Sequence, residues 1–341
     1  MTTTRPEDPK NGAARSDETR APVASLHHVT AIASDAQANH DFYTAVLGLR
    51  LVKKTVNFDD PGSYHLYYGD AVGAPGTALT FFPWRDLPRG RPGLGQTVLT
   101  QFSAPPGSLD FWVERLRAHG APVHARETLF GEERIISEDP DGMGFTITEV
   151  AKDARADGGA LWTTPEIGAD VALRGFHGVT LALAEASPTA RVLTEGFDYR
   201  REAEEPGFVG DKPARLIRYR GEGPGAVVDI HEAPGLARGR DGAGVVHHIA
   251  FSVKDRAAQA EVSRRLAALG HPTTPQIDRD YFWAIYFRTP GGVLFEVATD
   301  EPGFERDEPR ESLGAALKLP SRYETMRARI EQALPPLETG A

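Results

Sequence analysis

The sequence predicts an α+β protein built from four βαβββ modules that follow one another along the chain. Three observations support this prediction. The same order of one strand, one helix and three strands recurs four times in 341 residues. A His-His doublet opens the first strand of the first and last modules, at His27-His28 and His247-His248. The helices predicted in the first two modules end at glycine, at Gly48 and Gly120.

The first module opens with an alternating strand over residues 26–33. Ser34 or Asp35 then caps a helix that runs to Leu47, because either side chain can accept a hydrogen bond from a free N–H of the first turn. Three strands complete the module, over residues 49–56, 64–68 and 78–82.

The second and third modules repeat this order, although the helix of the third is weakly marked. In the second module we expect a strand, a helix and three strands over residues 96–103, 109–119, 123–126, 133–137 and 145–150. In the third module the same elements are expected over residues 176–183, 188–194, 199–202, 214–219 and 226–231.

The fourth module begins with an alternating strand over residues 245–253. Its helix is expected over residues 256–269, with one apolar side formed by Ala258, Val262, Leu266 and Leu269. Three strands are predicted to follow over residues 273–277, 283–288 and 293–298.

The domain organisation follows from these repeats. Modules one and two occupy residues 24–151, and modules three and four occupy residues 173–304. Residues 1–23 are expected to form a disordered tail, and residues 152–172, which include Gly158-Gly159, a linker. Residues 305–341 form a C-terminal extension with a short helix over 321–334, which should pack on the body through Tyr323, Met326, Ile330 and Leu334.

Composition excludes several classes of function. The net charge of −10 and the pI near 5.6 argue against a nucleic-acid partner, because phosphate binding depends on basic patches. The absence of cysteine excludes disulfides, thiolate catalysis and cysteine-ligated metals. No apolar run is long enough to span a membrane, and the first 22 residues do not resemble a signal peptide, so a cytoplasmic location is expected.

Three side chains have the character of metal ligands. His28 shares its strand face with Thr30, and His248 shares its face with Ala250, so both imidazoles point into space that no large side chain fills. Glu296 lies in an apolar strand, where an unpaired carboxylate would be costly to bury. Two imidazoles and one carboxylate form the facial triad of non-haem Fe(II) oxygenases, although Zn, Mn and Ni accept the same ligands.

The chain resembles the vicinal oxygen chelate superfamily, which includes glyoxalase I, bleomycin-resistance proteins and type I extradiol dioxygenases. The resemblance rests on the module order, on the segment from Asp41 to Leu49 in module one and on the segment Pro290-Gly291-Gly292-Val293-Leu294-Phe295-Glu296 in the last strand of module four. Over roughly residues 24 to 335 the chain is most similar to the ring-cleaving dioxygenases of hydroquinones, such as 2,6-dichlorohydroquinone 1,2-dioxygenase. The resemblance implies that the four modules pair into two open vicinal-oxygen-chelate barrels.

The resemblance also implies roles for individual residues. His28, His248 and Glu296 match the iron ligands, Tyr286 and Arg279 match positions that contact substrate, and His27 and His247 match flanking histidines. Other interpretations stay open at this stage. By strand parity His27 and His247 face away from the metal and could be structural, Tyr286 could be a wall residue, and Arg279 a surface charge. Four other histidines have no partner motif and are interpreted as structural or exposed: His65, His124, His231 and His271.

Only the first and last modules carry strong candidate ligands. In module three, Gly178 occupies the position that His28 has in module one and His248 has in module four. Module two has no histidine in its first strand. The residues at the position of Glu296 are Thr80, Thr146 and Asp229. We therefore expect modules one and four to meet around the metal and modules two and three to form a metal-free partner barrel.

The expected function is an Fe(II)-dependent, extradiol-type dioxygenase, with Mn(II) as the alternative metal. Its partners would be O2 and a small aromatic diol, a hydroquinone first and a catechol second, with neither nucleic acid nor membrane involved. Homo-oligomerisation, the ring substituents and the cleavage position are left open. The rival functions are a glyoxalase-like metal-dependent isomerase or lyase and a metal-free protein that binds or sequesters small aromatic compounds.

Overall fold

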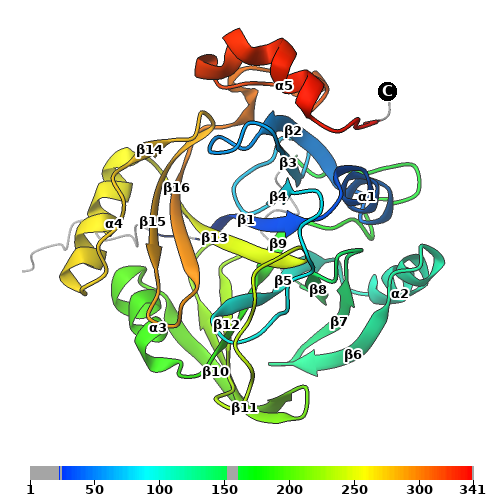
Figure 1. The fold of residues 1–341 in the computed structure, drawn as a ribbon. Helices are drawn as coiled ribbons and strands as arrows, with labels where there is room; N and C mark the ends of the chain where they lie inside the picture. The colour runs from blue at the N-terminus through cyan, green and yellow to red at the C-terminus, as the bar shows by residue number, and fades with distance from the viewer. Residues whose placement is uncertain (1–22, 24, 152–159, 340–341) are drawn as a thin grey trace, which may run out of the picture.

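The computed structural model describes residue 23 and residues 25–151 and 160–339. The predicted tail, except Val23, and the first part of the predicted linker lie outside these residues. The described chain forms two curled, eight-stranded sheets with helices on their outer sides (Figure 1). Within the described residues, no helix has the length and apolarity needed to cross a bilayer.

The first sheet combines modules one and four. Its strand order is β14-β15-β16-β13-β1-β4-β3-β2, so that β1 and β13 lie antiparallel at the centre. The prediction that these two modules meet is confirmed. The strands are β1 (Leu26–Ala33), β2 (Arg50–Val56), β3 (Tyr64–Gly69), β4 (Ala78–Pro83), β13 (Val245–Val253), β14 (Ile277–Asp278), β15 (Phe282–Arg288) and β16 (Leu294–Pro302).

The second sheet combines modules two and three in the same way, with the order β10-β11-β12-β9-β5-β8-β7-β6. We call it the partner sheet and the first one the catalytic sheet. The strands of the partner sheet are β5 (Gln96–Ala104), β6 (Val123–Leu129), β7 (Glu132–Glu138), β8 (Gly144–Glu149), β9 (Phe176–Leu183), β10 (Arg200–Val209), β11 (Lys212–Arg220) and β12 (Val227–Glu232).

The module helices begin and end largely as predicted. Asp35, not Ser34, is the N-cap of α1 (Ala36–Asp41), where its carboxylate accepts from the Ala38 N–H at 2.8 Å. The helix continues as a π-helical turn, η1 (Phe42–Val46), before Gly48 ends it with a positive φ of 68°. The other helices are α2 (Leu109–Ala118), α3 (Ser187–Arg191) with its π-helical turn η3 (Val192–Gly196), and α4 (Arg256–Ala268).

Three local predictions were wrong. The strand predicted over residues 273–277 is reduced to β14, because Pro275 has no N–H with which to continue a ladder. The strand predicted to end at Glu202 extends to Val209, since it is an edge strand and Pro206 is tolerated there. Met326 does not pack on the body and is 39% exposed.

The C-terminal extension lies over β2 and the end of α1. It contains η4 (Phe304–Arg306), η5 (Arg310–Ser312), η6 (Ser321–Met326) and α5 (Arg327–Ala333). Lys53 of β2 is buried and pairs with Asp307, at 2.6 Å, and with Glu308. Lys53 pairs in the register with Tyr67, and the Tyr67 ring packs against Phe304, so the extension covers the inner face of the catalytic sheet rather than the face that packs on α1.

A single apolar core runs through both sheets and fixes how they sit together. Phe42 of module one lies 6.1 Å from Phe145 of module two, centroid to centroid, and the Tyr43 hydroxyl donates to Asp139 at 3.0 Å. The central strands β1 and β13 are buried along nearly their whole length. The histidine doublets thus lie on the two strands at the buried centre of the sheet.

Candidate metal centre

His28, His248 and Glu296 meet on three strands of the catalytic sheet. In the register, Thr30 of β1 lies opposite His248 of β13, and Ala250 lies opposite Glu296 of β16. One ligand atom of each residue falls within 4.8 Å of the other two, and all three residues are buried. The structure therefore brings together three side chains that are separated by up to 268 positions, from 28 to 296, in the sequence.

The donor set fits a divalent cation. The Nε2 atoms of His28 and His248 lie 3.4 Å apart, and they are 3.4 and 2.9 Å from the Glu296 carboxylate. Yet neither oxygen of Glu296 accepts a hydrogen bond of normal geometry, although its side chain is fully buried. Burial alone would raise the pKa of Glu296, but the two imidazoles outweigh burial and hold it well below its usual range. A bound cation would balance the charge of this ionised carboxylate and take the place of the missing hydrogen bonds.

The flanking histidines contact the far side of the candidate ligands. Nδ1 of His27 lies 2.9 Å from Nδ1 of His28, and Nδ1 of His247 lies 2.8 Å from Nδ1 of His248. Burial lowers the pKa of His27 to about 3, so its ring is neutral and its Nδ1 can accept a hydrogen bond from the Nδ1–H of His28. Each ligand histidine can then hold its proton on Nδ1 and leave Nε2 free for a metal.

Tyr286 and Arg279 lie beside this centre. Tyr286 of β15 pairs with Glu296 in the sheet, and its ring centroid is 5.9 Å from that of His248. Arg279 donates to the Tyr286 hydroxyl at 3.2 Å and approaches Asp59 at 3.3 Å. Arg279 is thus a wall residue of the site rather than a free surface charge. Burial raises the pKa of Tyr286 well above its usual value, so the phenol stays protonated at neutral pH.

A cavity of about 410 Å³ opens above the three candidate ligands. This volume suits a single small molecule. Its walls are mainly aromatic or apolar, and its polar groups come from the loop after β2 and from the residues described above. The lining includes Phe58, Phe82, Trp84, Phe282 and Leu294, together with Asn57, Asp59, Asp60, Arg279 and Tyr286.

Sequence reasoning missed two polar residues of the cavity, His65 and Tyr67. His65 was interpreted as structural or exposed, but it is buried and lines the cavity. Its Nε2 lies 2.9 Å from the Thr80 hydroxyl, and its Nδ1 lies 2.8 Å from the Tyr67 hydroxyl. Their spacing of two residues on β3 places both side chains on one face of that strand, a signal that could have identified them.

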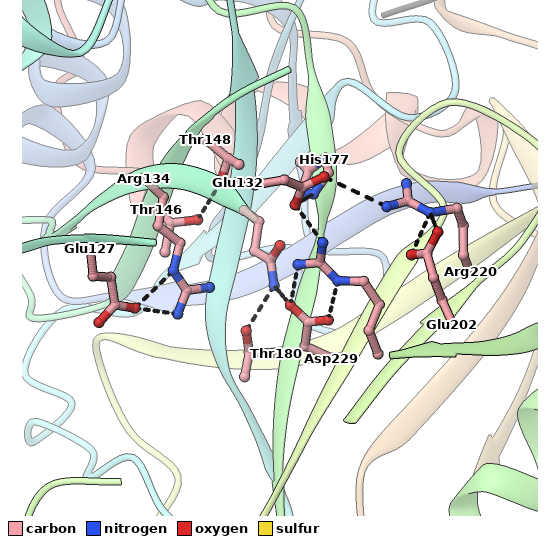
Figure 2. Close-up of polar contacts among 12 residues, drawn as sticks. Glu127, Glu132, Arg134, Thr146, Thr148, His177, Thr180, Glu202, Arg220 and Asp229 are labelled. Carbon is pink, nitrogen blue, oxygen red and sulfur yellow. Dashed lines mark hydrogen bonds and ion pairs between the residues drawn. The ribbon is translucent and has the colours of Figure 1, made fainter. Parts of the chain in front are cut away.

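In the partner sheet, an ion-pair cluster takes the equivalent place (Figure 2). Asp229 pairs with Thr180 in the register, as Glu296 pairs with Ala250. The Arg218 guanidinium contacts both Asp229 oxygens at 2.8 and 2.9 Å and also contacts Glu132. Gln101 donates to Asp229 at 2.9 Å. The guanidinium supplies the positive charge that a metal ion would supply in the catalytic sheet.

The backbone around Gly178 leaves no room for a metal-ligating side chain at this position of the partner sheet. A Cβ atom on Gly178 would lie 2.2 Å from the Val227 carbonyl oxygen, which is far inside van der Waals contact. Any side chain at this position would displace β12. Among the residues that the structure describes, the group of His28, His248 and Glu296 is accordingly the one cluster with metal-ligating geometry.

This architecture and site are those of a known superfamily. The family model described as "Glyoxalase/Bleomycin resistance protein/Dioxygenase superfamily" matches residues 25–147 and 162–297. The chain belongs to this superfamily, and the expected α+β fold of paired βαβββ modules is confirmed.

Individual relatives match almost the whole chain. "Putative ring-cleaving dioxygenase MhqO" of Bacillus subtilis is 45% identical over 315 residues, which cover 92% of this chain and 96% of the relative. Chlorohydroquinone/hydroquinone 1,2-dioxygenase of Sphingobium indicum is 34% identical over 316 residues, 90% of this chain and 95% of the relative. The crystal structure of a protein described as a "putative dioxygenase" from Bacillus subtilis superposes with a TM-score of 0.86 at 43% identity, covering 94% of this chain and 99% of that one.

Proposed function

We propose that this protein is an Fe(II)-dependent dioxygenase that opens the ring of a hydroquinone, with catechol as the second substrate class and Mn(II) as the alternative metal. The observation that carries the proposal is the convergence of His28, His248 and Glu296 at the base of a largely aromatic cavity. The names of relatives that are 45% and 34% identical support the same class of enzyme.

His28, His248 and Glu296 would hold the metal, and His27 and His247 would set the tautomers of the two imidazoles. Two histidines and one carboxylate leave several coordination positions for other ligands. Held by these three residues, the metal would supply Lewis-acid and redox chemistry toward O2 and a substrate hydroxyl.

The protein's own side chains would bind and orient the ring. Phe82, Phe282 and Leu294 line the cavity and exclude water from the ring faces. The protonated Tyr286 hydroxyl can donate to a substrate oxygen next to Glu296, and Arg279 keeps that hydroxyl in place through its hydrogen bond at 3.2 Å. The Tyr286 hydroxyl would therefore act as a proton donor to the substrate oxygen, at a fixed distance from the metal ligands.

The cavity does not favour a glyoxalase-like isomerase. Such a site usually has a fourth protein ligand, and the position for it carries Thr80. The Thr80 hydroxyl contacts the Thr30 hydroxyl at 2.8 Å and His65 at 2.9 Å. A hydroxyl already engaged in two hydrogen bonds does not replace a carboxylate ligand, so the His-His-Glu set argues for the oxygenase.

The test combines metal analysis with oxygen uptake. Protein purified without oxygen should contain one iron per chain and consume O2 rapidly when hydroquinone or methylhydroquinone is added, and more slowly with catechol. The variant His28→Ala should lose both properties. Nickel or zinc without oxygen uptake would instead indicate an isomerase, and the absence of any bound metal would leave only a binding role.

A further inference from the structure

Asn57 extends the inner wall of the catalytic sheet beyond the end of β2. Its backbone N–H donates to the Ser63 carbonyl at 2.9 Å, which continues the pairing of β2 with β3 by one step. Strand alternation therefore places Asn57 on the same face as Thr55, whose partner in the register is His65. Asn57 and His65 both line the cavity of the metal centre, and Asn57 is only 7% exposed. Asn57 is thus a buried polar side chain in the cavity wall.

The Asn57 side chain keeps a free hydrogen-bond donor in this cavity. Its Oδ1 accepts from the Asp59 backbone N–H at 2.9 Å, and this bond fixes which way the amide faces. Its Nδ2 donates to no residue that the structure describes, yet protein atoms do not enclose it. The two N–H groups of Nδ2 are therefore available to a molecule in the cavity. A buried donor favours a ligand that brings an acceptor, because an unpaired donor weakens binding.

Asn57 belongs to a part of the wall that is separate from the candidate metal ligands. It follows β2, the edge strand of the catalytic sheet, whereas β1, β13 and β16 carry the ligands. Glu296 pairs in the register with Tyr286, whose hydroxyl accepts from Arg279 at 3.2 Å. Arg279 in turn approaches Asp59, in the loop after β2, at 3.3 Å. A substrate ring with one oxygen at the metal ligands would therefore direct its opposite carbon toward the loop of Asn57 and Asp59.

The charges of this loop favour a neutral group on the substrate. The carboxylates of Asp59 and Asp60 both line the cavity. Asp59 is paired with a cation, but among the described residues the Asp60 carboxylate accepts only from neutral donors, the Ser63 hydroxyl at 2.8 Å and the Trp84 indole at 3.1 Å. An anionic substituent beside Asp60 is therefore disfavoured. A hydroxyl suits the loop, because it can accept from Asn57 and donate to a carboxylate.

We propose that Asn57 determines the preference of this site for hydroquinones over catechols, by donating to the substrate hydroxyl that lies across the ring from the metal. The inference rests on the proposed function, because it requires one substrate oxygen at His28, His248 and Glu296. A hydroquinone has its second oxygen opposite the first and directs it toward Asn57. A catechol carries both oxygens at one end of the ring, so it presents only C–H groups to Asn57 and leaves the donor unpaired.

The contact is tested by isothermal titration calorimetry of the full chain without oxygen, using hydroquinone and phenol, which lacks the second hydroxyl. Wild type should bind hydroquinone about tenfold more tightly than phenol, the size expected for one hydrogen bond to a buried donor. Asn57→Asp replaces the donor by an acceptor of the same shape and keeps the bond to the Asp59 N–H. Asn57→Ser can keep that bond without adding a charge. In both variants the two affinities should agree within about threefold.

Ser63→Ala is the matched control, because it changes the same loop outside the cavity, and it should keep the wild-type ratio of affinities. Circular dichroism checks that each variant folds, and either Asn57 variant alone decides the question. Three results would overturn the proposal: equal binding of hydroquinone and phenol by wild type, an unchanged ratio in the Asn57 variants, or a loss of the ratio in Ser63→Ala as well.

Oxygen uptake by the same samples separates this inference from the proposed function. The ratio of kcat/KM for hydroquinone to that for catechol should fall about tenfold in the Asn57 variants. An affinity ratio that depends on Asn57, without oxygen uptake by wild type, would keep the contact and refute the dioxygenase. Oxygen uptake with ratios that do not depend on Asn57 would refute the contact alone.

Discussion

The two sheets of this molecule share one topology and differ in what lies at their centres. In the catalytic sheet, two imidazoles and a carboxylate face an open cavity, and Glu296 accepts no hydrogen bond. In the partner sheet, the equivalent carboxylate, Asp229, is held by Arg218 and Gln101. Glu296 is available to a cation from outside the chain, whereas Asp229 is paired with a cation of the chain itself, the Arg218 guanidinium.

The comparison teaches that the fold supplies a position and the side chains supply the chemistry. The difference depends on few residues. Tyr286 pairs with Glu296, and Arg218 occupies the same register position opposite Asp229. Gly178 replaces a ligand histidine and permits close approach of β12. Each of the following predictions changes one of the two sheets, and the first and last use the other sheet as a control.

The largest effect is expected from the metal ligands. His248→Ala should lower the rate of oxygen uptake by about a thousandfold or more, because the proposed metal would lose one of three protein ligands. His177→Ala, which changes a buried histidine of the partner sheet, should leave the rate per folded molecule unchanged. Oxygen-electrode assays on both variants check this. An equal loss of oxygen uptake in the two variants would contradict the prediction that only the catalytic sheet holds the metal.

The next effect is on stability. Arg218→Met leaves Asp229 and Glu132 without their shared cation, and removing one partner of a buried ion pair typically costs about 3 to 5 kcal/mol. Urea unfolding should show a decrease of this size in the free energy of unfolding. The double variant Arg218→Met/Asp229→Leu should recover most of the loss, because no buried charge is then unpaired at that position. If the single variant is as stable as wild type, the ion pair does not hold the partner sheet together.

The partner sheet should also be sensitive to acid. Burial would raise the pKa of Glu132, but His177 and Arg218 outweigh it and lower the pKa from 4.5 to about 2. A carboxylate with a depressed pKa stabilises the fold above its unfolded pKa, and this contribution is lost as the pH falls from about 4.5 to about 2. Its size is at most about 3 kcal/mol. Urea midpoints of wild type and Glu132→Gln should therefore differ at pH 6 and converge near pH 2; a constant difference would contradict the assignment.

The smallest effect is expected at Tyr286. Tyr286→Phe should lower kcat roughly ten- to hundredfold while the iron content stays the same, because the change removes a proton donor and no metal ligand. Tyr219→Phe, on the matching strand of the partner sheet, is the control and should not change kcat. Loss of iron from Tyr286→Phe would show instead that the tyrosine acts by positioning Glu296.

The sequence by itself determined the modules and the candidate ligands. Strand alternation and glycine stops are local signals, so they marked the four βαβββ units without any knowledge of distant contacts. Two identical doublets at equivalent places, with one carboxylate in an apolar strand, were enough to select His28, His248 and Glu296. The superfamily was recognisable from the same residues.

Only the tertiary structure decided how these residues act together. His65 lacks a motif of its own, and it became part of the cavity because β3 lies next to β4 and Thr80. Arg279 and Asp59 meet across 220 residues, and Arg218 reaches Glu132 across 86. Such contacts depend on strand pairing between modules, which no local pattern encodes.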